Sequence, residues 1–282
     1  MATQTVTLLT DWGNTDHYAA VVRARLFAKI PDVRVVDISH SVPRGDVWAA
    51  AYMAIDTYPY FPENTIHIVG VEDISTTENV HMVVRFGHQY IIGTDNGFFT
   101  ILQILSGRKM DPVYQIDISP ESKVHTFPSR DLFSKVASML SAGMSLDQIG
   151  KPAGFHSRII EGPGIEVQRT FDKDSNDNII EMQLSGRVLF VDSFGNVVTN
   201  ITRKQCEACL TEYDFSELYA ASRKIPGRFK QKYTEVAVAA PVFIFLENGF
   251  LEIAVNRGSI YKMFGITPGS KVIMRFKPKT KQ

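Results

Sequence analysis

Cysteine is scarce in this chain of 282 residues, which contains only Cys206 and Cys209. Their C-x-x-C spacing also occurs in redox and zinc sites. However, no second Cys or His pair lies nearby, and the motif does not follow a strand as it does in thioredoxin-type proteins. We therefore interpret the pair as two thiols on or near a short helix, and we expect no metal site.

Net charge and long apolar runs are absent as well. Thirty basic and thirty acidic residues cancel, so no overall field favours nucleic acid or an anionic membrane as a partner. No stretch approaches the ~18 apolar residues of a membrane helix, and the N-terminus lacks the charged and apolar regions of a signal peptide. We expect a soluble, cytoplasmic protein.

The length favours two domains, and the first 160 residues alternate strand and helix signals. Short β-rich runs at residues 5–10, 33–38 and 65–71 are separated by apolar residues at helical spacing. The other elements expected here are helices at 16–27, 46–58 (capped by Asp46), 96–105 and 130–142 (opened by Ser129), a hairpin at 80–86 and 89–93, and a strand at 113–116. This alternation predicts an α/β domain, residues 1–160, with a mostly parallel central sheet covered on both faces.

The pattern changes after about residue 155. Glycine and proline at 162–164 and a polar stretch at 172–178 predict a linker at 161–178. Strand signals then dominate, at residues 179–184, 187–192, 242–246, 250–255 and 271–276, with helical signals only at 203–209 and 215–221. We expect a smaller, mainly antiparallel, β-barrel-like domain at residues 179–282.

Polar clusters follow several of the predicted strands, which is where ligands bind in open parallel sheets. Asp11 leaves the first strand, and its carboxylate could accept hydrogen bonds from both hydroxyls of a ribose. Capping of the following helix is the competing interpretation, which is favoured for Asp16 and stays open for Asp11. Residues 192–196, taken alone, predict a turn with Gly195 or Asn196 in a left-handed conformation.

Seven polar or glycine-containing segments occur along the chain, and their order and spacing are informative. They are residues 10–16 (TDWGNTD), 35–46 (VVDISHSVPRGD), 60–69 (YFPENTIHIV), 93–97 (GTDNG), 126–131 (TFPSRD), 191–201 (VDSFGNVVTNI) and 248–259 (NGFLEIAVNRGS). In this order the chain resembles the S-adenosyl-L-methionine hydroxide adenosyltransferases, the superfamily that also holds the fluorinase and chlorinase. The resemblance covers nearly the whole chain.

The resemblance implies S-adenosylmethionine or adenosine as the ligand and requires no cofactor or metal. It implies that Asp11 holds the ribose hydroxyls and that Phe127 and Ser129 line the reacting centre. The positions that it assigns to the methionine part and the adenine side are Asp192, Phe194, Asn196 and Asn248. It also implies a homotrimer, with each site between the N-terminal domain of one subunit and the C-terminal domain of the next.

The chain departs from the family where water is activated. Hydroxide-transferring members carry an Asp, an Arg and a His, and the aligned residues here are Glu72, Asn79 and Pro128. Asn supplies no guanidinium charge and Pro has no proton to move, so the family's route to hydroxide is impaired. Three replacements stay open: Glu72 alone with a raised pKa, Asp73 or Glu78 in place of the Asp, or His125 on a shifted loop.

Halide is a poor nucleophile for this sequence. Ser75 and Ser129 match a Thr and a halide-contacting Ser of the fluorinase, but Glu72 replaces its Tyr, and a carboxylate repels a nearby halide. We therefore expect transfer of the adenosyl group to water, giving adenosine and L-methionine, with Glu72, Ser75 and Ser129 as catalytic candidates. The alternatives are a binder without activity and an adenosyltransferase with another nucleophile. A purely structural trimer would have no need of the retained binding positions.

Overall fold

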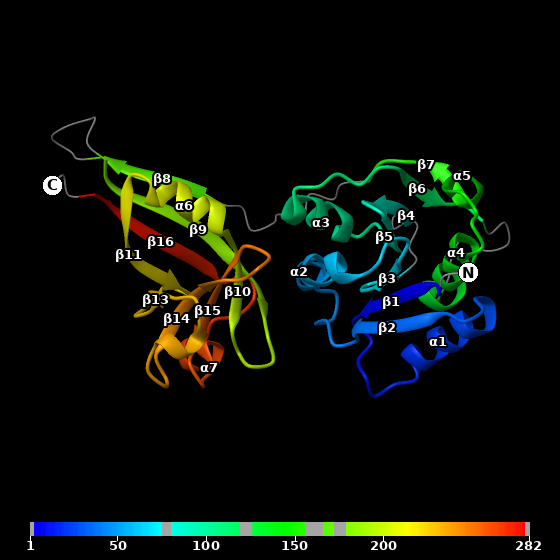
Figure 1. Cartoon of the computed structure of the whole chain (residues 1–282), viewed down its shortest axis with the longest axis horizontal. Coiled ribbons are helices and arrows are strands. Elements are labelled where there is room, and N and C mark those ends of the chain that lie inside the picture. Colours follow the sequence, from blue (N-terminus) through cyan, green and yellow to red (C-terminus); the bar gives the residue numbers. More distant parts are fainter. Residues whose placement is uncertain (1–2, 75–79, 119–125, 156–165, 172–178, 280–282) are drawn as a thin grey trace. The chain divides into compact units, whose positions relative to one another are not determined.

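The computed structural model describes residues 3–74, 80–118, 126–155, 166–171 and 179–279. The chain divides into two compact units, Met1–Ile160 and Glu161–Gln282, each with its own sheet. The first unit is α/β and the second is mainly β (Figure 1). Within the described ranges, no helix is long and apolar enough to cross a membrane.

A seven-stranded sheet forms the centre of the first unit, in the order β2-β1-β3-β5-β4-β6-β7. Its strands are β1 (Thr5–Thr10), β2 (Arg34–Ser39), β3 (Ile66–Gly70), β4 (His81–Phe86), β5 (Gln89–Thr94), β6 (Val113–Ile116) and β7 (Gly150–Pro152). β2, β1, β3 and β5 are parallel neighbours, whereas β4, β6 and β7 join in antiparallel pairs. The expected mostly parallel sheet is therefore mixed, because the tight β4–β5 hairpin reverses the chain direction.

Helices pack in two pairs around this sheet (Figure 1): α1 (Tyr18–Lys29) contacts α4 (Ser134–Ser141), and α2 (Val47–Thr57) contacts α3 (Phe98–Ser106). The short helices are η1 (Tyr58–Tyr60), η2 (Ser129–Phe133) and α5 (Leu146–Ile149). Val6 and Leu8 of β1 share a core with Val22 of α1 and Val136 of α4. Every residue of β1 is buried, as in a strand covered on both faces.

The helix starts agree only in part with the sequence. Asp46 caps α2 as predicted, accepting a hydrogen bond from the Ala49 N–H at 2.9 Å. The prediction that Asp16 caps α1 is wrong, because the N-cap is His17 and its side chain makes no capping bond. Ser129 is the first residue of η2 and not its N-cap, which is Pro128. The Ser129 hydroxyl donates a hydrogen bond to Asp73.

The second unit contains a nine-stranded sheet in the order β12-β11-β16-β9-β10-β15-β14-β13, with β8 paired to β9. Its strands are β8 (Glu166–Phe171), β9 (Ile179–Val191), β10 (Val197–Thr202), β11 (Tyr213–Ala220), β12 (Arg223–Ile225), β13 (Arg228–Phe229), β14 (Pro241–Phe245), β15 (Phe250–Val255) and β16 (Lys271–Pro278). Its helices are α6 (Arg203–Leu210), η3 (Tyr233–Glu235) and α7 (Ile260–Phe264). Every described pairing is antiparallel except β13 with β14. Barrel-like closure stays a prediction.

Three expectations for this unit differ from the structure. Residues 215–221 were expected to be helical, but 215–220 belong to strand β11, because alternate residues such as Leu218 and Ala220 are buried against β12 and β16. The segment expected to be a linker, 161–178, contains β8, which is part of the sheet. β9 is one continuous strand where two were expected.

The two cysteines lie on α6 as expected, and both are buried. Burial raises the pKa of the Cys206 thiol to about 12, with Cys209 and Glu207 adding to the effect. A thiol with so high a pKa is neither a nucleophile nor a ready metal ligand. Both belong to the core of the second unit.

Candidate functional site

The carboxyl ends of β1 and β3 lie side by side, because these strands are parallel neighbours. Asp11 follows β1, and its Oδ2 accepts hydrogen bonds from the backbone N–H of Gly45 at 2.9 Å and of Glu72 at 3.2 Å. These two donors fix the position of the carboxylate. Because the cap of α1 is His17, Asp11 does not cap that helix.

Glu72 is exposed and has a φ of +46°. This left-handed backbone is uncommon for a residue with a side chain. A Cβ built on Gly45, which also has a positive φ of +70°, would lie 3.8 Å from the Glu72 Oε2. The Glu72 carboxylate therefore lies against the glycine that holds Asp11.

Ser129 pairs with Asp73 and not with Glu72. The Ser129 hydroxyl donates a hydrogen bond to the Asp73 Oδ2, and the Ser129 N–H donates to the same oxygen at 3.3 Å. The Ser129 side chain is fully buried. Burial raises the pKa of the Asp73 carboxyl, and the charge of Asp11 adds to this, while the Ser129 hydrogen bonds oppose it.

Gly70, the last residue of β3, leaves room for this pair. A Cβ at this position would lie 2.9 Å from the Ser129 Oγ and 2.4 Å from the Trp12 Cζ2. Real Cβ atoms do not approach other atoms so closely, so a side chain at this position would push the serine or the indole aside. The carboxyl end of β3 therefore packs against the side chains of Trp12 and Ser129 with no space for a side chain at Gly70.

Phe127 forms an aromatic wall beside them. Its ring packs edge-on against Trp12, with centroids 5.1 Å apart, and against Tyr18, at 5.5 Å. The Arg130 guanidinium lies 5.6 Å from the same ring centroid. The resemblance implies that Phe127 lines the reacting centre, which stays a prediction; in the structure its ring contacts Trp12, two residues after the end of β1.

His40 was not singled out in the sequence. It follows β2, and its Nδ1 lies 2.7 Å from the Thr10 Oγ1. Its Nε2 lies 3.2 Å from the Asp37 Oδ1 and 3.3 Å from an Arg23 nitrogen. Its ring stacks on Trp12 at 6.0 Å. Its place at the end of a third parallel strand is the signal that could have identified it.

In the second unit, Asp192 organises its own turn. Its Oδ1 accepts from the N–H groups of Phe194 and Asn196 at 2.9 and 2.8 Å, and its Oδ2 accepts from the Asn196 Nδ2 at 3.0 Å. Gly195 has a φ of +84°, as the turn interpretation predicted. The turn leaves the Phe194 ring 77% exposed, an unusual position for a large apolar side chain.

Two further acceptors lie in this unit. The Asn248 Oδ1 accepts from the Phe250 N–H at 3.0 Å. Glu252, on the otherwise apolar strand β15, is buried and accepts from the Tyr233 hydroxyl at 2.7 Å. Burial raises the pKa of the Glu252 carboxyl, and the charge of Asp192 contributes. An acid inside an apolar strand was the sequence signal for it.

Several predicted residues lie outside the described ranges, namely Ser75, Glu78, Asn79 and His125. Among the residues that are described, no group of three or more His, Cys, Asp or Glu side chains is arranged to hold a metal ion.

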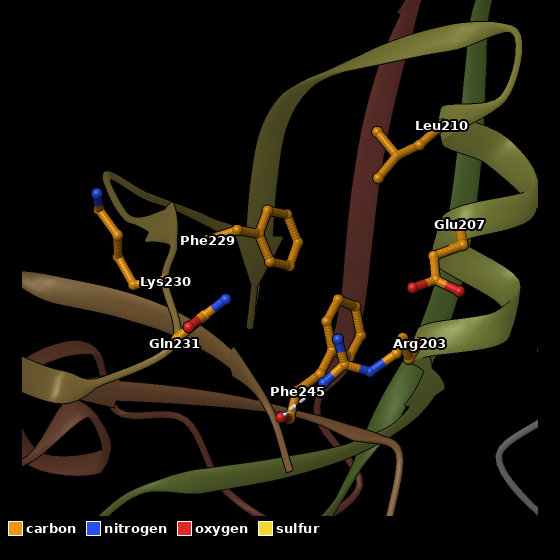
Figure 2. A pocket seen from close by; sticks show the side chains of 7 residues that line it. All are labelled: Arg203, Glu207, Leu210, Phe229, Lys230, Gln231 and Phe245. Carbon is orange, nitrogen blue, oxygen red and sulfur yellow. Dashed lines mark hydrogen bonds between the residues drawn. The ribbon is translucent and has the colours of Figure 1, made fainter. Parts of the chain in front are cut away.

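A hollow of about 470 Å³ opens on the second unit beside α6, and Figure 2 shows its lining. Arg203 donates a hydrogen bond to the Phe245 carbonyl at 3.1 Å, and its guanidinium lies 5.1 Å from the Phe245 ring centroid. The Phe229 and Phe245 rings stack at 5.4 Å. None of the residues predicted to bind substrate lines this hollow.

Comparison with protein families identifies both halves of the chain. The family model described as the SAM hydroxide adenosyltransferase N-terminal domain matches residues 6–150. The model of the C-terminal domain of the same family matches residues 186–273. The two matches include all the described residues discussed above as site candidates.

Individual relatives cover almost the same length. An (R)-S-adenosyl-L-methionine hydrolase of Thermus thermophilus is 29% identical over 95% of this chain and 98% of its own. A fluorinase of Nocardia brasiliensis is 24% identical over 95% of each chain. A solved structure of an uncharacterised Thermotoga maritima protein aligns with a TM-score of 0.79, at 24% identity, over 95% of this chain and 99% of that one.

Proposed function

Because this chain belongs to the S-adenosylmethionine hydroxide adenosyltransferase family, we propose that it binds S-adenosylmethionine and transfers the adenosyl group to water. The products are adenosine and L-methionine. The observation that carries the proposal is the fixed carboxylate of Asp11 at the carboxyl end of β1. Two backbone donors hold its Oδ2, and its Oδ1 is the acceptor for the ribose hydroxyls.

The reaction needs no metal or cofactor, because the sulfonium of S-adenosylmethionine is itself a good leaving group. Water attacks the ribose 5′ carbon in line with the C–S bond, and the electron pair of that bond leaves with sulfur. The protein positions the two partners and excludes bulk water. The Phe127 wall, built on Trp12 and Tyr18, is the apolar surface beside which this happens.

Water is favoured over halide by the charges at this edge. Asp11, Glu72 and Asp73 bring three carboxyl groups to the ends of β1 and β3. Carboxylates repel a halide at close range and stabilise a sulfonium cation. The chain is similar to a fluorinase, but these charges are the reason that we do not extend halide transfer to it.

In this proposal, residues of the second unit also contact the substrate. Asp192, Phe194, Asn196 and Asn248 are the proposed contacts for the methionine part and the adenine side. The exposed ring of Phe194 supports a site that is completed by another surface. We propose that the second surface is the N-terminal unit of a neighbouring subunit in a homotrimer.

The alternative is a protein that binds S-adenosylmethionine without converting it. Its support is Pro128, which is buried beside Ser129 at the position where the family resemblance implies a His. A product assay separates the two functions. Purified protein is incubated with S-adenosylmethionine, with and without chloride or fluoride, and adenosine, methionine and halogenated nucleoside are followed by chromatography.

Calorimetric titration with S-adenosylmethionine accompanies this assay. We expect adenosine and methionine in equal amounts, above the spontaneous rate, and no halogenated nucleoside. Binding without release of adenosine would establish the binder. The absence of both binding and turnover would contradict the proposed function.

A further inference from the structure

We propose that Asp73, paired with Ser129, is the group that accepts the proton of the attacking water. This inference rests on the proposed function and concerns the same site. It assigns the base to a residue one position beyond Glu72, the acid that sequence alignment favours.

The geometry separates the two neighbouring acids. The Asp73 Oδ2 is fixed by both the hydroxyl and the N–H of Ser129, at the start of η2. The backbone of Ser129 is itself anchored, since its carbonyl accepts from the Ser134 hydroxyl at 2.8 Å. Glu72 is exposed and lies against Gly45. Only Asp73 is therefore rigidly joined to the reacting centre that Phe127 and Ser129 line.

The surroundings make Asp73 a stronger base than an ordinary aspartate. Its charged neighbour from β1 is Asp11, its partner from η2 is Ser129, and Glu72 precedes it on its own loop. Burial and the Asp11 charge both raise its pKa. A general base works best when its pKa lies nearer the working pH, so these shifts favour proton acceptance.

The proposed step balances in atoms and charge. The water oxygen forms a bond to the ribose 5′ carbon while the C–S bond breaks, and sulfur keeps that electron pair as a neutral thioether. One water proton stays on the new 5′ hydroxyl. The other passes through the Ser129 hydroxyl to the Asp73 carboxylate and is then lost to solvent.

The test compares the wild type with Asp73→Asn, and with Asp147→Asn as a matched control on the exposed surface of α5. We expect Asp73→Asn to lower kcat by about 10²–10⁴-fold, the usual contribution of a positioned acid–base group. Its Kd for S-adenosylmethionine, measured by calorimetry, should stay within about threefold of the wild type, and Asp147→Asn should match the wild type in both values.

The pH profile of wild-type kcat provides a second measurement that needs no variant. Because the pKa of Asp73 is raised, the rate should fall with acid at a pH above the ordinary aspartate range, as the carboxylate takes up its proton. A wild-type rate without this acidic limb overturns the proposal. So does an Asp73→Asn variant with wild-type kcat, and in both cases wild-type turnover leaves the proposed function standing. A wild type without turnover overturns both.

Discussion

At the scale of single residues, the proposed binding of S-adenosylmethionine depends most on Asp11. Replacing it with Asn keeps the size and one oxygen for the Gly45 and Glu72 N–H groups, but it removes the charge. Hydrogen bonds to a charged group contribute about 1.5–3 kcal/mol, so we expect the Kd for S-adenosylmethionine to rise by about 10- to 100-fold. Calorimetry measures this, with Asp214→Asn on the exposed side of β11 as the control. An unchanged Kd would remove Asp11 from the site.

His67 predicts how stability depends on pH. Its ring is buried between Thr7, Gln89 and Tyr58, and burial lowers its pKa to about 3. In the unfolded chain the pKa of His67 has its ordinary value of about 6.5. Below that pH the unfolded chain binds a proton on His67 that the folded chain does not. Stability is therefore complete above pH ~6.5 and falls as the pH drops towards 3.

Because of His67, the free energy of unfolding should fall by about 1 kcal/mol between pH 6.5 and pH 5.5. Urea unfolding at the two pH values should show that loss in the wild type and a smaller one in His67→Gln, whose amide keeps polar contacts without titrating. Equal losses in the two proteins would mean that His67 is not the group responsible.

The surroundings of the candidate site residues were only partly predictable from sequence. Asp11, Phe127 and Ser129 follow from strand ends and from the family resemblance, and the structure places them at the carboxyl edge of the first sheet. By contrast, the sequence did not predict that Asp73 is the hydrogen-bond partner of Ser129. Asp73 lies 56 positions away, and the left-handed backbone at Glu72 decides which of two adjacent acids turns inward.

At the scale of elements, the end of β3 is a tightly packed point of the first unit. In Gly70→Ala the new methyl group would meet Trp12 and Ser129 at distances that no real contact has. We expect a loss of about 1–3 kcal/mol in the free energy of unfolding, the usual cost of overpacking, together with a lower kcat. Gly154→Ala, which would meet no atom within 4 Å, is the control. Equal stability of the two variants would contradict this packing.

The elements themselves show where sequence patterns suffice. The strand Thr5–Thr10 and the hairpin at β4 and β5 agree with the prediction because their apolar runs end at clear turn signals. β11 was misjudged because its side chains are only half-buried at several positions, which weakens the period-two pattern. The pairing that fixes it comes from β16, more than fifty residues away, and no local signal reports that.

At the scale of the whole molecule, the division into two units follows from the change in pattern near residue 155, and the first unit ends at Ile160. The arrangement of subunits is a proposal with a direct test. Sedimentation should give a mass about three times the 31.6 kDa of the chain. A monomer that releases adenosine at the full rate would contradict the trimer and its shared site.

The origin of the oxygen in the product tests the central claim most directly. Wild-type protein is incubated with S-adenosylmethionine in water enriched in ¹⁸O, and the adenosine is analysed by mass spectrometry. We predict adenosine with one ¹⁸O in its 5′ hydroxyl, in proportion to the enrichment, and unlabelled L-methionine. Absence of adenosine, or adenosine without the label, would contradict adenosyl transfer to water by this protein.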